Sequence, residues 1–209
     1  MAKLYFRYGA MNSGKSTALL QAAFNYEERG QRVLLAKPRI DLKGDDEIVS
    51  RLGMTRRADV LIDPDDDVEA LFADAAARID HDSLLEDLHL PVPPVACLLV
   101  DEAQFLTRTQ VDGLMRIAVT TNVPVMAYGI RTDFRTAAFP GSARLLEIAH
   151  SLEELKTICR CGRKAMFNGR KVGHEFVFTG DQVAIDGMAV SYESLCPTCY
   201  LEESGGHLG

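Results

Sequence analysis

The chain of 209 residues has no long apolar run and no excess of positive charge, and each absence excludes a class of protein. No stretch of about 18 consecutive apolar residues occurs, which excludes an ordinary membrane-spanning helix. The N-terminus has no apolar segment followed by a cleavage site, so we expect a cytoplasmic protein. The formal net charge of −7 argues against a protein that binds duplex DNA or an anionic membrane surface.

The sequence also has no internal repeat and no low-complexity segment. Its hydrophobic fraction of 47% is enough to bury a sizeable core. At this length we expect one domain, or one domain with a small appendage.

Residues 9–16 read GAMNSGKS and match the G-x-x-x-x-G-K-[ST] pattern of a phosphate-binding loop. The motif requires a strand before it and a helix after it. Residues 3–8 are rich in aromatic side chains and predict a short strand, and the apolar spacing in residues 17–28 predicts a helix. The alternative is a glycine-rich turn before an ordinary helix.

The residue types in this loop suit a triphosphate. Gly9 and Gly14 let main-chain N–H groups approach a phosphate, and the start of the helix adds its positive dipole end. Lys15 can reach the β- and γ-phosphates, and the Ser16 hydroxyl can ligate the accompanying magnesium. The loop therefore predicts a nucleotide-binding protein.

Residues 95–100 form an apolar run that ends in Asp101 and Glu102. Such a run predicts a strand buried on both faces of a parallel sheet, and the two carboxylates resemble the end of a Walker B strand. Asp101 can hold the magnesium shell, and Glu102 lies one residue further toward the γ-phosphate, where a general base is needed. The alternative is an acidic pair at the start of a solvated loop.

Further strands are predicted at residues 32–36 and 123–128, each after a helical pattern. Alternating strands and helices predict an α/β fold with a mostly parallel sheet, in which the phosphate loop lies at the carboxyl end of a strand.

The segment of residues 63–89 is strongly acidic. Asp65 or Asp66 is predicted to cap a helix that extends to Ile79. The rest of the segment predicts a surface loop.

Short β-prone pieces separated by glycines begin after residue 155, among them residues 175–178 and 182–185. We therefore predict a nucleotide-binding core at residues 1–155, a small β-rich unit at 156–201 and a flexible tail at 202–209.

Four of the five cysteines fall in this small unit as two close pairs, Cys159 with Cys161 and Cys196 with Cys199. Four thiolates suit a closed tetrahedral zinc site, whereas paired disulfides are disfavoured in the cytosol. The alternative is free or redox-active thiols. Cys97 lies in the apolar strand and is predicted to be a core residue.

A local basic patch lies near the cysteines, although the chain as a whole is acidic. A solvated hairpin face is the favoured interpretation, and nucleic-acid binding is the alternative. The patch comprises Arg160, Arg163, Lys164, Arg170 and Lys171.

Taken together, these motifs resemble the zinc-containing type of thymidine kinase, a cytosolic deoxynucleoside kinase with a RecA-like core. The resemblance covers about residues 4–199 and rests on several strings that occur in order. These strings are residues 9–17, 101–106 (DEAQFL), 128–134 (YGIRTDF), 154–159 (ELKTIC), and Tyr192 followed by Cys196 and Cys199.

The resemblance implies transfer of the γ-phosphoryl group of ATP to the 5′-hydroxyl of thymidine, with Glu102 as the general base and Mg²⁺ held by Ser16 and Asp101. Asp41 matches an acidic position of the family, and Lys43 stands where many members have arginine. The residues implied to bind ATP are Gly9, Ala10, Met11, Asn12, Ser13, Gly14, Lys15, Ser16, Thr17, Asp101, Glu102, Ala103 and Gln104.

The resemblance also implies an apolar nucleoside site closed by a lasso loop at about residues 183–192. A metal-fixed anchor at Cys196 would tie the end of that loop. Without the resemblance, the aromatic residues of the site would be read as core. The implied substrate residues are Met11, Phe105, Phe134, Phe139 and Tyr192, and Asn168 occupies a substrate-side position that varies among members.

Two departures from the family are visible. The segment of residues 73–95 is longer and more acidic than the family requires, and C-x-C replaces the commoner C-x-x-C at Cys159 and Cys161. The family further implies a homotetramer and inhibition by the end product, thymidine triphosphate.

Two rival functions use the same phosphate loop. One is a P-loop ATPase whose zinc unit binds nucleic acid or a protein partner, and the other is a different small-molecule kinase or a nucleotidyltransferase. The net acidity of the chain and the aromatic residues near Glu102 disfavour the ATPase.

Overall fold

The computed structural model describes residues 1–39, 46–78, 92–182 and 190–208. Asp41 and Lys43 lie outside the described residues, as do the later part of the acidic segment and most of the predicted loop at residues 183–192. The predicted strand at 182–185 also falls there, apart from Gln182.

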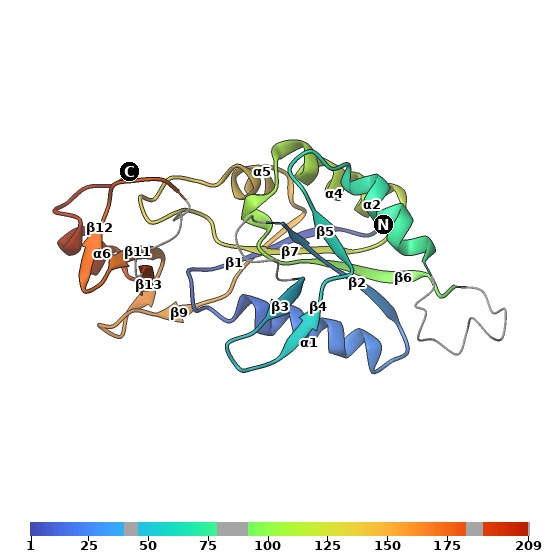
Figure 1. The fold of residues 1–209 in the computed structure, drawn as a ribbon, viewed down its shortest axis with the longest axis horizontal. Coiled ribbons are helices and arrows are strands. Elements are labelled where there is room, and N and C mark those ends of the chain that lie inside the picture. The colour runs from blue at the N-terminus through green and yellow to red at the C-terminus, as the bar shows by residue number, and fades with distance from the viewer. Residues whose placement is uncertain (40–45, 79–91, 183–189, 209) are drawn as a thin grey trace.

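Six described strands of the core form one parallel sheet in the order β5-β2-β6-β7-β1-β8 (Figure 1). This sheet confirms the predicted α/β class, and the strands expected from residues 3–8, 32–36, 95–100 and 123–128 are all present in it. The strands are β1 (Leu4–Tyr8), β2 (Arg32–Pro38), β5 (Val60–Ile62), β6 (Val95–Val100), β7 (Val125–Gly129) and β8 (Ser151–Glu154).

Helices cover both faces of the sheet, with α1 on one face and α2, α4 and α5 on the other (Figure 1). Along β6, Leu98 and Val100 pack toward α2 and α4, whereas Cys97 and Leu99 pack toward α1. This two-sided burial explains why β6 is apolar throughout, and it confirms Cys97 as a core residue. The helices are α1 (Lys15–Glu27), α2 (Val68–Ala77), α4 (Arg108–Thr120) and α5 (Pro140–Ile148).

Helix α2 is capped by Asp67, whose carboxylate accepts hydrogen bonds from the main-chain N–H groups of Glu69 (2.9 Å) and Ala70 (3.4 Å). The prediction of Asp65 or Asp66 as the cap is wrong. The Asp66 carboxylate instead accepts from the main-chain N–H of Asp63 at 2.7 Å and closes the turn before the helix.

A hairpin that the sequence did not predict lies beside α1. It consists of β3 (Glu47–Val49) and β4 (Thr55–Arg57), which pair antiparallel. Ile48 is buried against the apolar side of α1, and the Arg56 guanidinium donates to both carboxylate oxygens of Glu27 at 2.8 and 2.9 Å. These contacts hold the hairpin against α1, with Arg56 at the last residue of that helix.

The chain after residue 155 forms a β-rich unit at one end of the central sheet (Figure 1). Its own small core contains three of the four cysteines, Leu195 and Tyr200. Helix α6 ends at Glu203, beyond the boundary predicted at residue 201. The elements are β9 (Thr157–Ile158), β10 (Lys164–Ala165), β11 (Phe167–Val172), β12 (Glu175–Val177), β13 (Val190–Leu195) and α6 (Pro197–Glu203).

The described part of the chain contains no helix with both the length and the apolar character needed to cross a membrane.

Candidate functional site

The phosphate loop joins β1 directly to α1, as predicted. Gly14, at φ 76°, precedes the helix, and no side chain caps the first N–H groups of α1. Those groups therefore remain available to an anion. A Cβ atom at Gly9 would lie 2.3 Å from the main-chain oxygen of Leu155, so only glycine fits there.

Lys15 lies in the loop with its ammonium group folded toward the main chain. Its Nζ donates to the carbonyl oxygens of Ala10 (2.9 Å) and Gly9 (3.4 Å). Burial lowers the pKa of Lys15, because the charged form loses solvation. A phosphate group would give this ammonium the charged partner that the two carbonyl oxygens do not supply.

Asp101 follows the carboxyl end of β6, and its Oδ2 accepts a hydrogen bond from the Ser16 hydroxyl at 2.9 Å. Because β1, β7 and β6 are parallel, their carboxyl ends meet at one edge of the sheet, with β7 between the other two. Burial and the adjacent Glu102 raise the pKa of Asp101. Ser16 and Asp101 thus offer two hard oxygen ligands side by side, which is the chemistry that Mg²⁺ requires.

Glu102 adopts the left-handed backbone region at φ 49°, an uncommon conformation for a residue other than glycine. Its carboxylate accepts a hydrogen bond from Gln104 Nε2, and Gln104 Oε1 accepts from the main-chain N–H of Ile130 at 3.2 Å. The short 3-10 helix Ala103–Phe105 follows. The strained backbone and the hydrogen bonds through Gln104 therefore both orient the Glu102 carboxylate.

Lys15, Ser16 and Glu102 open onto one cavity of about 1010 Å³. Its wall includes the phosphate loop with the first turn of α1, Glu102, and the start of β13 with Tyr192. The β3–β4 hairpin adds Val49, Arg51 and Leu52. Sequence reasoning missed these three residues; the local signal is Gly53, which at φ 85° marks a tight turn but does not show where the turn lies.

The four predicted zinc ligands come together in the C-terminal unit. The sulfur atoms of Cys159, Cys161, Cys196 and Cys199 all lie within 4.8 Å of one another. Tetrahedral Zn–S bonds of about 2.3 Å place sulfurs roughly 3.8 Å apart, so the donor set fits zinc despite the C-x-C spacing. The main-chain N–H of Cys199 donates to the Cys196 sulfur at 3.5 Å and lowers the pKa of that thiol, which favours the thiolate that a metal needs.

The sequence model of the thymidine kinase family matches residues 2–200 of this chain. The chain belongs to the thymidine kinase family. The thymidine kinase of Legionella pneumophila (strain Lens) is 45% identical over 211 residues, covering 100% of this chain and 92% of the relative. The thymidine kinase of Mesorhizobium japonicum is 46% identical (98% and 94% covered), and that of Enterobacteria phage T4 is 46% identical (94% and 94% covered).

The substrate residues that the thymidine kinase resemblance implied lie in two places. Tyr192 and Met11 line the cavity beside the phosphate loop. Phe134 and Phe139 are buried, and Phe139 meets Phe105 edge-on with ring centroids 5.4 Å apart. These three phenylalanines are not among the residues that line this cavity.

The phosphate loop is tied to the C-terminal unit through Met11. The Met11 main-chain N–H donates to Asn168 Oδ1 at 2.7 Å, and the Ser194 hydroxyl donates to its carbonyl oxygen. Asn168 and Ser194 are both buried and lie opposite each other on β11 and β13. The small unit and the nucleotide-binding core therefore share one site.

The predicted basic patch is not a free cationic surface. Arg160 pairs with Glu203, Lys164 pairs with Glu154 at 2.6 Å, and Lys171 pairs with Glu193. Phosphate binding relies on unpaired lysine and arginine side chains, so these pairings and the family membership do not favour the nucleic-acid ATPase.

Proposed function

We propose that this protein transfers the γ-phosphoryl group of ATP to the 5′-hydroxyl of thymidine, giving thymidine monophosphate. Membership of the thymidine kinase family supports thymidine as the substrate. The relatives named thymidine kinase are 45–46% identical to this chain, and the alignments cover nearly their full length. The observation that carries the mechanism is the cavity shared by Lys15, Glu102 and Tyr192.

In this proposal the phosphate loop, residues 9–17, and residues 101–104 bind ATP. The free N–H groups at the start of α1 and the Lys15 ammonium neutralise charge on the transferring phosphoryl group, which is the largest requirement of this chemistry. Ser16 and Asp101 would hold Mg²⁺, which supplies further charge neutralisation when bound.

Glu102 acts as the general base. It accepts the proton of the 5′-hydroxyl as that oxygen attacks the γ-phosphorus, and the bond to the β,γ-bridging oxygen breaks. The hydrogen bond from Gln104 holds the carboxylate in place and leaves a second oxygen for the proton. ADP is the leaving group.

Met11, Phe105, Phe134, Phe139 and Tyr192 form the nucleoside site in this proposal, because the four aromatic rings offer flat surfaces to a pyrimidine and Met11 adds apolar contact. The cysteine cluster binds structural zinc and fixes the end of β13, four residues beyond Tyr192. Ordering this anchor in advance reduces the entropy lost when the nucleoside binds.

Other properties of the family extend to this chain as part of the proposal. These are a homotetrameric assembly, inhibition by thymidine triphosphate and a cytoplasmic location. We also propose the predicted division into a core at residues 1–155, a zinc unit from 156 and a tail, with the boundary at 201/202 moved past the end of α6 at Glu203.

A coupled assay of ADP release tests the function directly. Thymidine, deoxycytidine, deoxyguanosine and DNA are added separately to protein, Mg²⁺ and ATP. We expect stimulation by thymidine and none by DNA. Stimulation by DNA without stimulation by any nucleoside would support the rival ATPase and overturn the proposal.

A further inference from the structure

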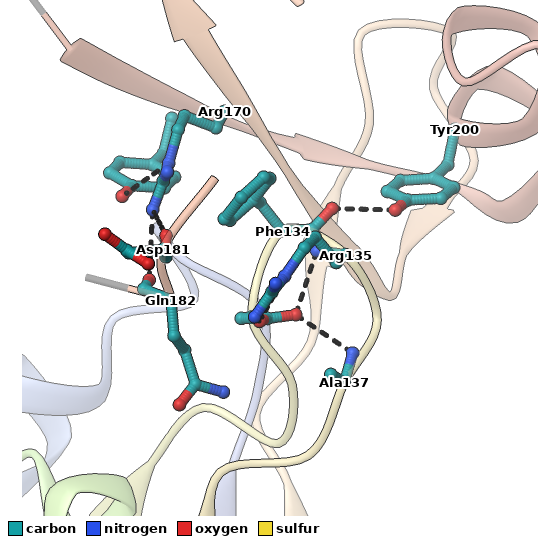
Figure 2. Close-up of polar contacts among 9 residues, drawn as sticks. Phe134, Arg135, Ala137, Arg170, Asp181, Gln182 and Tyr200 are labelled. Atoms are coloured by element: carbon teal, nitrogen blue, oxygen red, sulfur yellow. Dashed lines mark hydrogen bonds and ion pairs between the residues drawn. The ribbon is translucent and has the colours of Figure 1, made fainter. Parts of the chain in front are cut away.

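Arg170 on β11 is a buried cation that joins three separate segments of the C-terminal half. Arg170 is only 6% exposed. Nη2 donates to the main-chain oxygens of Asp181 (2.7 Å) and Gln182 (3.0 Å), as Figure 2 shows, and Nε donates to the Tyr192 hydroxyl at 3.3 Å.

The same guanidinium lies against two aromatic rings. Its central carbon is 3.6 Å from the ring centroid of Phe134 and 5.8 Å from that of Tyr192. Among the residues that the structure describes, no carboxylate pairs with Arg170. A buried charge without an opposite partner is unfavourable unless hydrogen bonds and ring faces offset the lost solvation. Here three hydrogen bonds and the faces of the two rings offset that cost, so the guanidinium and both rings are held in one arrangement.

The main chain around Phe134 is fixed by other groups. The Tyr200 hydroxyl donates to the Phe134 carbonyl oxygen at 2.7 Å, and the buried Asp133 carboxylate accepts from the N–H groups of Arg135 and Ala137, both at 2.9 Å (Figure 2). Arg170 thus touches the ring of Phe134, while Tyr200 and Asp133 hold its backbone. Changing Arg170 should disturb ring orientation without unfolding the turn.

We propose that Arg170 is a positioning residue for nucleoside binding, which orients the Phe134 and Tyr192 side chains toward the base. This role rests on the thymidine kinase activity proposed above. It requires arginine, because only a planar guanidinium can lie flat over the Phe134 ring and also donate from its edge to the Tyr192 hydroxyl and two main-chain oxygens. Lysine keeps the charge but has neither property.

The exchange Arg170→Lys tests this role, and Lys171→Arg is its matched control. Lys171 is the next residue of β11 and pairs with Glu193, so the control makes the reverse swap one position away. We expect Arg170→Lys to raise the thymidine KM about tenfold and to leave the ATP KM within about twofold, since ground-state binding of one substrate is lost. Lys171→Arg should change neither.

Tyr192→Phe supplies a second variant, since it removes only the hydroxyl that accepts from Arg170 Nε. Its thymidine KM should rise by a smaller factor than that of Arg170→Lys. In the double variant the thymidine KM should rise by less than the product of the two single effects, because both substitutions remove the same hydrogen bond. Multiplicative effects would contradict the coupling.

An unchanged thymidine KM in Arg170→Lys, or a parallel rise of the thymidine and ATP KM values, would overturn the positioning role while the wild-type activity stands. A wild-type protein that fails to phosphorylate thymidine would overturn the proposed function, and the role of Arg170 with it.

Discussion

At the scale of single residues, the site depends on two groups held in unfavourable states. Glu102 has a left-handed backbone, a conformation that costs about 1–3 kcal/mol in a residue other than glycine. Lys15 is a buried ammonium bonded only to carbonyl oxygens among the described residues. In the proposed mechanism, a bound triphosphate gives the Lys15 ammonium the charged partner that it lacks.

Lys15→Ala should reduce kcat/KM for ATP by about 10² or more, because it removes the one loop cation placed to meet the transferring phosphoryl group. Steady-state kinetics with ATP varied measures the effect. Unchanged activity in Lys15→Ala would refute the assignment of the phosphate loop.

The motif residues could be predicted from sequence because their spacing is local, within residues 9–16 and 95–102. The positions of Arg51 and Arg170 could not, because the fold alone brings Arg51 to the cavity and Arg170 to Phe134 and Tyr192. Arg51 arrives on a hairpin with an exposed second strand, and Arg170 was read only as part of a charged patch. Asp67 was missed as a cap because four aspartates in the run 63–67 match the same local pattern.

At the scale of elements, short N-terminal signals decide where helices begin. Asp67→Ala should lower the free energy of unfolding by about 1 kcal/mol, since the first N–H groups of α2 lose their acceptor. Urea denaturation measures the change. Asp65→Ala is the matched control, because Asp65 is exposed and is not the cap. Equal effects of the two substitutions would contradict the assigned cap.

The cysteine cluster is the second element-scale feature, because it joins β9, β13 and α6. Replacing Cys196 and Cys199 together with serine should release bound zinc and raise the thymidine KM several-fold, with a smaller effect on the ATP KM. Metal analysis and steady-state kinetics measure the two effects. An unchanged thymidine KM in zinc-free protein would break the proposed link between the metal and the nucleoside site.

Elements with strong periodicity were predictable, and short edge elements were not. The strands β1, β2, β6 and β7 are buried in the sheet and carry apolar runs. By contrast, β4 is exposed at every position and β8 is mostly polar, so neither has a pattern that marks a strand. The order of strands follows from long-range packing and is not encoded in any local segment.

At the scale of the whole molecule, the parallel sheet brings the candidate site residues together at one edge. The loops after β1 and β6 supply the cation and the carboxylates, and the C-terminal unit closes the same cavity with Tyr192. The hydrogen bonds that Met11 makes with Asn168 and Ser194 join the phosphate loop to the C-terminal unit. The fold therefore places the phosphate loop and Tyr192, the groups that we propose bind phosphate and nucleoside, on one cavity.

The kcat of Glu102→Gln, measured with thymidine and ATP, tests the central claim most directly. Glutamine keeps the shape of the side chain but cannot accept the proton, so we predict a fall in kcat of about 10² or more with ATP affinity and melting temperature unchanged. Near-normal turnover in a folded protein that binds ATP would contradict the role of Glu102 as the base and, with it, the proposed mechanism.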